Sequence, residues 1–190
     1  MLTTAPMSAE PVALQRYDRR TIVLHWVTAV LVIVLWVSAH FIDSFPRGPA
    51  RTNMRSVHIL LGVILAAVLV SRIVWRRLAG VRLPDVGHPV LARLASSVHF
   101  VLYALLVAEV LLGFTNAWVR GESIFGLFSI PSFAPDDRPL RQLINRVHDL
   151  VANTILVVAG LHAVAALVHH FFWKDEVLRR MWPSRGARRA

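Results

Sequence analysis

Four histidines lie in a single strongly apolar segment near the end of the sequence: His148, His162, His169 and His170. An imidazole is polar, so placing it inside a membrane is costly unless another group binds it. Histidine is also a frequent ligand of metal ions and of haem iron. The residue type and its setting therefore predict that imidazoles of this segment hold a buried cofactor.

The spacing of two of these histidines suits a pair of stacked haems. His148 and His162 are 14 positions apart, which on an α-helix leaves them within about 40° of the same direction and about 21 Å apart along the axis. One helix would therefore offer a ligand near the outer leaflet and another towards the inner leaflet. A zinc site would instead need its ligands gathered at one depth.

Membrane-spanning helices must position these histidines, and the composition supplies them. Hydrophobic residues make up 56% of the 190-residue chain, and they fall in blocks that reach the length of about 20 residues needed to cross a bilayer. The predicted spans are 21–42, 57–75, 94–119 and 147–173. The linkers 44–51, 82–90 and 129–139 contain proline or glycine, so we predict that they are non-helical. The fold class is therefore an all-α, integral membrane four-helix bundle.

Basic residues indicate how this bundle lies in the membrane. The two tails and the central linker together hold more arginine and lysine than the other two loops, and such residues favour the cytoplasmic side. Both termini are therefore predicted to be cytoplasmic. The net charge of +10 comes largely from arginines that flank the spans, so no nucleic acid partner is expected. The chain has no cysteine, which excludes disulfides, thiolate-bound iron–sulfur clusters and thioether-linked haem.

Each haem iron needs a second axial ligand from a facing helix. In this topology His58 lies at the depth of His148, and these two residues form the outer pair. His25 lies towards the depth of His162, and these two form the inner pair. His99 is a rival to His25, because it also lies near the cytoplasmic end of its span. Position alone does not rank the two.

Other polar and small residues bear on the haem prediction. Arg72 follows His58 by 14 positions, on the same face and at the inner depth, where a cation could pair with a haem propionate. Gly62 and Gly160 lie beside predicted ligands and would make room for a flat macrocycle. Glu109 lies mid-span. An intramembrane carboxylate is a functional candidate, but a neutral packing residue is an equal alternative.

Several segments are similar to those of a known family. They are TIVLHW around His25, SVHILLGV around His58, SRIVWR around Arg72, and the closing segment RVHDLVANTILVVAGLHAVAALVHHFFWKDEVLRRM. Over roughly residues 15–183 the chain resembles the bacterial cytochrome b561 family, and most closely its superoxide oxidase members. The resemblance implies a multi-pass protein of the bacterial inner membrane with two non-covalent b-type haems. It also implies iron ligation by His25, His58, His148 and His162, which favours His25 over His99.

The resemblance further implies that superoxide is oxidised to oxygen at the periplasmic face and that electrons pass through both haems to ubiquinone. Arginines on that side could attract the superoxide anion by electrostatic focusing, although lipid contact is the simpler role for any single one. They are Arg47, Arg51, Arg55, Arg120, Arg138, Arg141 and Arg146. His169 lies on the face of His162, nearly two turns further on, where it could hydrogen-bond a quinone and supply a proton. His170 points elsewhere and suits the membrane interface.

An alternative function is that of an electron-transfer subunit, as in the related cytochrome b subunits of formate dehydrogenase and nickel hydrogenase. A separate redox partner would then deliver the electrons. The short loops offer no docking domain, so the preferred interpretation needs superoxide, ubiquinone and membrane lipid, without a protein partner.

The domain organisation is predicted to be simple. We expect a flexible N-terminal tail at 1–15, a transmembrane cytochrome b domain at 16–183 and a basic C-terminal tail at 184–190.

Overall fold

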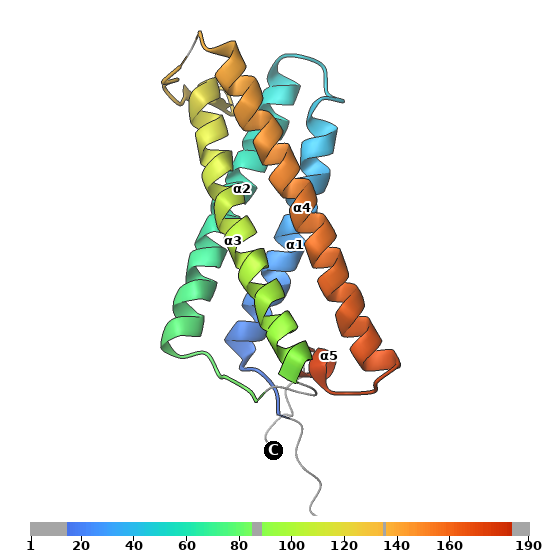
Figure 1. The fold of residues 1–190 in the computed structure, drawn as a ribbon. Helices are drawn as coiled ribbons and strands as arrows, with labels where there is room; N and C mark the ends of the chain where they lie inside the picture. The colour runs from blue at the N-terminus through green and yellow to red at the C-terminus, as the bar shows by residue number, and fades with distance from the viewer. Residues whose placement is uncertain (1–14, 85–88, 135, 184–190) are drawn as a thin grey trace, which may run out of the picture.

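The computed structural model describes residues 15–84, 89–134 and 136–183, so the two predicted tails lie almost wholly outside the described residues. Within these residues, four helices are long and apolar enough to cross a membrane: α1 (Arg19–Ile42), α2 (Pro49–Leu78), α3 (Pro89–Arg120) and α4 (Arg138–Phe171). They run alongside one another as an up-and-down bundle (Figure 1). The predicted all-α membrane four-helix bundle is confirmed.

All four helices begin before the predicted spans, and the three with the larger differences, α2, α3 and α4, each have a proline in the first turn. Pro49, Pro89 and Pro139 lie in the first turns of α2, α3 and α4. The first N–H groups of a helix have no intrahelical acceptor, so a proline there loses no hydrogen bond. The fixed φ of proline is also already helical. The prediction of non-helical linkers is therefore wrong for residues 49–51, 89–90 and 138–139.

A small antiparallel hairpin, which the sequence analysis did not predict, closes one end of the bundle. Its strands are β1 (Ser123–Ile124) and β2 (Phe128–Ser129), and its turn places Phe125 at φ 52° and Gly126 at φ 72°. The fully buried Ser56 of α2 accepts a hydrogen bond from the Phe125 N–H at 2.8 Å. The hairpin is thereby held against α2. We call this end of the bundle the hairpin end, and the opposite end, where the short helix α5 (Val177–Arg180) lies, the α5 end (Figure 1).

Asp18 links the start of α1 to the end of α2 at the α5 end. Its carboxylate accepts hydrogen bonds from the Thr21 N–H at 2.9 Å, from the Trp75 indole at 3.0 Å and from a backbone N–H after α2. Partial burial works to raise the pKa of Asp18, but these hydrogen bonds together outweigh it and hold the pKa below its ordinary value of 3.8. The Tyr17 N–H donates to the Arg180 carbonyl at 3.2 Å. Both ends of the described chain therefore meet at the α5 end.

The hydrophobic core lies between the two levels of histidines. It is centred on Leu69, Leu106 and Ile155. Ile155 is seven residues from His148 and seven from His162, which is about two turns in each direction. The closely packed helix pairs are α1–α2, α2–α3 and α3–α4. The core thus separates two polar levels within an apolar bundle.

Candidate functional site

The outer pair lies towards the hairpin end, where α2 and α4 both begin. His58 and His148 are half-buried and lie near enough to interact electrostatically. The Nδ1 atom of His58 is 2.8 Å from the Ser38 hydroxyl, which donates its own hydrogen to the Leu35 carbonyl at 2.8 Å. The hydroxyl must therefore accept from the Nδ1–H of His58. This tautomer leaves Nε2 of His58 free to bind a metal.

Glu109 of α3 lies against the other member of the outer pair. Its Oε1 atom is 3.2 Å from Nδ1 of His148, and the Glu109 and His148 side chains are 14% and 17% exposed. The contact has the distance of an ion pair without the alignment of a hydrogen bond. Among the described residues, neither His148 Nδ1 nor Glu109 Oε2 has a hydrogen-bond partner. The mid-span carboxylate is therefore in contact with a predicted iron ligand.

The inner pair lies nearer the α5 end, where a third histidine joins it. The ring centroids of His25 and His162 are 6.4 Å apart, with an interplanar angle of 72°. The ring of His99 is closer to His162, at 5.1 Å and 67°. The structure thus brings both candidate ligands to His162, one from α1 and one from α3.

Arg72 lies directly beside the inner pair, as its spacing predicts. Its guanidinium donates to Nδ1 of His25 at 3.0 Å and lies 5.1 Å from the centroid of the Tyr103 ring. A guanidinium has no acceptor, so Nδ1 of His25 accepts in this arrangement. Iron ligation through Nε2 needs the ring hydrogen on Nδ1, and Arg72 then needs another acceptor. A haem propionate would provide one, so the propionate role of Arg72 stays a prediction.

The surroundings of the histidines fit a flat, bis-imidazole cofactor. A Cβ atom added at Gly62 or Gly160 would meet no atom within 4 Å. Each predicted ligand pair joins α4 to α1 or α2, neither of which is a closely packed neighbour of α4. Paired imidazoles on such helices, in a chain without thiolates, suit non-covalent b-type haem. The residues present therefore fit haem ligation at both levels.

His169 and His170 differ in their surroundings at the α5 end. Nδ1 of His169 forms a short contact with Oδ2 of Asp175, and its ring stands edge-on to Trp173 with centroids 4.4 Å apart. His170 instead lines a cavity of about 240 Å³. The other lining residues are Leu178, Arg179 and Trp182. The structure therefore places a defined partner on His169 and a cavity beside His170, and the quinone role of His169 stays a prediction.

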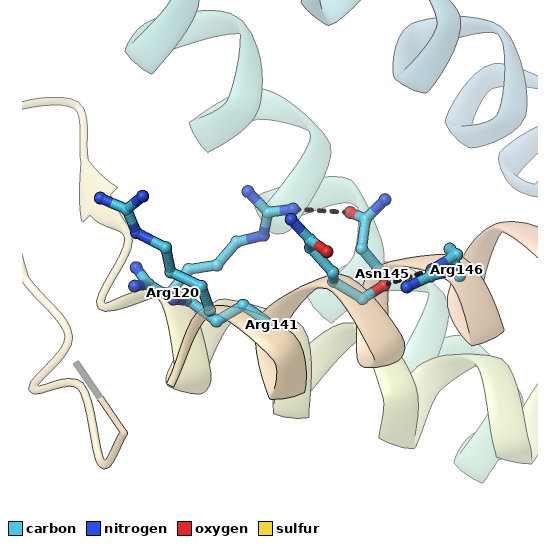
Figure 2. Close-up of a pocket in the computed structure, with 6 residues that line it drawn as sticks. Arg120, Arg141, Asn145 and Arg146 are labelled. Carbon is cyan, nitrogen blue, oxygen red and sulfur yellow. Dashed lines mark hydrogen bonds between the residues drawn. The ribbon is translucent and has the colours of Figure 1, made fainter. Parts of the chain in front are cut away.

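Six of the seven predicted arginines at the hairpin end separate into two groups. One group lines an open pocket of about 400 Å³ at the start of α4 (Figure 2). Its lining residues are Arg120, Arg138, Arg141, Gln142, Asn145 and Arg146. Elsewhere, Arg51 pairs with Asp43 and Arg55 with Glu122, each at 3.2 Å. Four of the seven predicted arginines thus line one pocket, and two others pair with carboxylates.

Two partners of the histidines were missed by sequence reasoning. Ser38 gives a weak signal, because a serine within a helix commonly bonds back to a preceding carbonyl and needs no other role. Asp175 belongs to the closing segment that carries the resemblance, but its contact with His169 depends on how the chain turns after α4. There the Asp175 N–H donates to the His169 carbonyl at 3.1 Å. Neither contact follows from helical spacing.

Comparison with known proteins identifies relatives along nearly the whole chain. The profile of the prokaryotic cytochrome b561 family matches residues 16–184. A Yersinia pestis protein named "Probable superoxide oxidase CybB" is 31% identical over 174 residues, which cover 90% of this chain and 98% of the relative. "Cytochrome b561 homolog 1" of Escherichia coli (strain K12) is 29% identical over 177 residues, or 90% and 99% of the two chains. "Cytochrome b562" of Cereibacter sphaeroides is 29% identical over 177 residues, or 89% and 96%.

The family match covers the four long helices and the histidines that they carry. It confirms the resemblance inferred from the sequence motifs. Together with the apolar helices, it makes this protein a multi-pass electron-transfer protein of the bacterial inner membrane that binds b-type haem. The chain belongs to the prokaryotic cytochrome b561 family.

Proposed function

We propose that the protein is a superoxide oxidase that binds two b-type haems and passes electrons from periplasmic superoxide to ubiquinone. The observation that carries this proposal is the two-level arrangement of histidines below an arginine-lined pocket. The outer haem would be held by His58 and His148, and the inner haem by His25 and His162. A relative of 31% identity is named as a superoxide oxidase, which supports the same activity.

The orientation follows from the same proposal. The hairpin end faces the periplasm, and the α5 end, where both described chain ends meet, faces the cytoplasm. The basic residues of the central linker and the tails support this orientation through the positive-inside rule.

The reaction balances with two superoxide anions for each quinone. Each superoxide loses one electron and becomes oxygen, and ubiquinone takes up two electrons and two protons to become ubiquinol. When bound, the haems supply the one-electron redox centres between the two membrane faces. The protein's own groups have three tasks: they attract the anion, orient the ligands and deliver protons.

The arginine pocket would attract the anion. Superoxide carries a negative charge, and a concave site lined by cations raises the local concentration of an anion and its rate of encounter. Arg120 is held in place because its guanidinium donates to Asn145 Oδ1 at 2.7 Å (Figure 2). The pocket lies at the start of α4, the helix that carries His148 on its third turn. The attracted anion thus arrives next to the outer pair.

Proton delivery would fall to His169 at the opposite end. Asp175 engages the hydrogen on its Nδ1 atom, so Nε2 can donate to a quinone oxygen only when the ring is protonated on both nitrogens. Histidine is suited to proton donation near neutral pH. The Asp175 contact and the packing on Trp173 hold the ring in one orientation.

A matched pair of charge reversals tests the capture site. Arg138 lines the pocket and Arg47 lies outside it, and both are exposed at the hairpin end. We expect Arg138→Glu to slow the reduction of the haems by superoxide several-fold more than Arg47→Glu does. Rising ionic strength should shrink the difference, because salt shortens the reach of these charges to about 8 Å near 0.15 M. Equal effects of the two variants, or rates indifferent to salt, would refute capture by the pocket.

A further inference from the structure

Glu109 is a buried carboxylate to which the proposed function gives no role. It is the one acidic residue of α3, between Pro89 and Arg120, and its side chain is 14% exposed. An ionised carboxylate among apolar side chains is costly unless a donor or a cation compensates it. The group that lies against it is the imidazole of His148, with 3.2 Å between Oε1 and Nδ1.

The ring of His148 is seated against the face of α3 that carries Glu109. Gly113 lies one turn further along α3, and a Cβ atom added there would be 3.4 Å from Cε1 of His148. Residues four apart share one face of a helix. The imidazole therefore packs within van der Waals reach of this face of α3, and the carboxylate one turn away meets its Nδ1 atom.

The chemistry of ligation fixes the direction of the contact. When His148 binds iron through Nε2, its Nδ1 keeps the ring hydrogen and can only donate. Oε1 of Glu109 lies 3.2 Å from Nδ1, so a small rotation of either side chain would align it to accept this hydrogen. Among the described residues, Nδ1 of His148 has no hydrogen-bond partner, so no aligned bond competes with the carboxylate.

We propose that Glu109 is a positioning residue for His148: its carboxylate accepts the Nδ1–H, orients the imidazole towards the iron and lowers the reduction potential of the outer haem. This inference rests on the proposed function, in which His148 is a ligand of that haem. A carboxylate on the second nitrogen makes a ligating imidazole more basic, and its negative charge favours ferric over ferrous iron. The other outer ligand, His58, has the neutral hydroxyl of Ser38 on its Nδ1 atom.

The substitution Glu109→Gln tests this role, because it removes the charge and keeps an acceptor oxygen and nearly the same volume. Redox titration of the purified protein, followed by optical spectroscopy, resolves the midpoint of each haem. We expect both haems to be retained and the reduction equilibrium of the outer haem to shift at least tenfold towards the ferrous state, which is about 59 mV for a one-electron couple. The inner haem should not move, and the EPR g values of the outer ferric haem should change.

Asp149→Asn is the matched control. Asp149 adjoins His148 in sequence and is exposed, and its carboxylate accepts a hydrogen bond from Asn145 at 2.9 Å. Because solvent screens an exposed charge, we expect this variant to shift the outer potential by less than about a third as much. An unchanged outer potential in Glu109→Gln would overturn the proposal. Equal shifts in the two variants would also overturn it, because they would reveal a general effect of charge.

Further variants separate the failure of this inference from the failure of the proposed function. If Glu109→Gln does not retain the outer haem, Glu109→Asp serves as the test instead. This variant keeps the negative charge but moves it away from Nδ1 of His148 by one methylene. A raised outer potential in Glu109→Asp supports the proposal, and an unchanged one refutes it. If His148→Ala retains both haems, the ligand assignment of the proposed function is wrong. Two normally bound haems with unmoved potentials refute the role of Glu109 alone.

Discussion

The outer and inner histidine pairs share one ligand type but differ in what contacts their second ring nitrogens. In the outer pair, Nδ1 of His58 meets a hydroxyl and Nδ1 of His148 meets a carboxylate. In the inner pair, Nδ1 of His25 meets the guanidinium of Arg72. Nearby negative charge stabilises ferric iron, and nearby positive charge stabilises ferrous iron. The outer pair thus has a carboxylate against a ring nitrogen, whereas the inner pair has a guanidinium.

This difference gives electron flow a direction within the proposed function. A carboxylate beside the outer haem makes it the weaker oxidant, and a cation beside the inner haem makes it the stronger one. Electrons that enter at the hairpin end would therefore move downhill towards the α5 end. In this proposal the histidines would hold the haems, and Glu109 and Arg72 would set the order of their reduction potentials.

The largest effect is expected from the ligands themselves. We predict that His148→Ala or His58→Ala removes the outer haem, and that His25→Ala removes the inner one, because each iron loses one of its two axial imidazoles. His99→Ala should retain both haems. The measurement is the haem content of purified protein, after extraction with acidic acetone. Loss of a haem in His99→Ala together with two haems in His25→Ala would give the inner site a His99–His162 pair, which their 5.1 Å ring separation also permits.

The next effect concerns the exit of electrons at the inner side. We predict that His169→Ala keeps two haems that superoxide still reduces, but that their reoxidation by ubiquinone slows about 100-fold, the lower range for loss of a general acid. His170→Ala should have a much smaller effect. Stopped-flow absorbance of pre-reduced protein mixed with ubiquinone measures both rates. If His170→Ala slowed reoxidation more than His169→Ala, the quinone would be placed in the cavity that His170 lines with Trp182.

A smaller effect is expected from the charge at the inner pair. We predict that Arg72→Gln lowers the midpoint potential of the inner haem by about 59 mV, which is a tenfold shift of its reduction equilibrium towards ferric iron. The midpoint potential of the outer haem should not change. Arg76→Gln, one turn along α2 at an exposed position, is the control and should change neither midpoint. An inner potential that stays constant in Arg72→Gln would remove the charge contrast between the two pairs.

The smallest effect concerns the contribution of an aspartate at each end of the bundle to the free energy of unfolding. Asp18 joins α1 and α2 at the α5 end, whereas Asp137 at the hairpin end caps α4 through a hydrogen bond from the Leu140 N–H at 2.9 Å. We predict that Asp18→Ala lowers the free energy of unfolding in detergent by about 1–2 kcal/mol near pH 7, and more than Asp137→Ala does.

The stabilisation from Asp18 should also depend on pH in one direction. Because its folded pKa lies below the ordinary value of 3.8, its contribution is complete above that value and is lost as the pH falls through the lower, folded pKa. Unfolding of the wild type and of Asp18→Ala, compared between pH 7 and pH 3, measures this loss. A difference between the two proteins that stays the same over this range would contradict the role of the ionised carboxylate.

The parts of this structure that could be predicted from the sequence are those that follow from helical geometry. The apolar blocks gave the four helices, and a separation of 14 residues placed His148 and His162 at two levels of α4. The same spacing placed Arg72 at the inner pair. These inferences need only the length of a membrane span and the pitch of a helix.

The remaining features depend on contacts between helices, which periodicity does not specify. The partnership of Glu109 with His148 requires the relative rotation of α3 and α4, and that of Ser38 with His58 requires the packing of α1 on α2. The pairing of Arg55 with Glu122 depends on the loop after α3. The helix starts at proline were misjudged for a local reason, because the same residue that interrupts a helix is favoured in its first turn.

A single experiment can establish whether this chain alone carries electrons from superoxide to quinone. Purified protein in detergent is exposed to a pulse of superoxide, with and without ubiquinone, while haem absorbance is recorded. We expect that superoxide reduces both haems without any partner protein, and that added ubiquinone reoxidises them with one ubiquinol formed for every two superoxide anions consumed. Haems that stay oxidised after the pulse, although dithionite reduces them, would contradict the claim and indicate a separate protein as the electron donor.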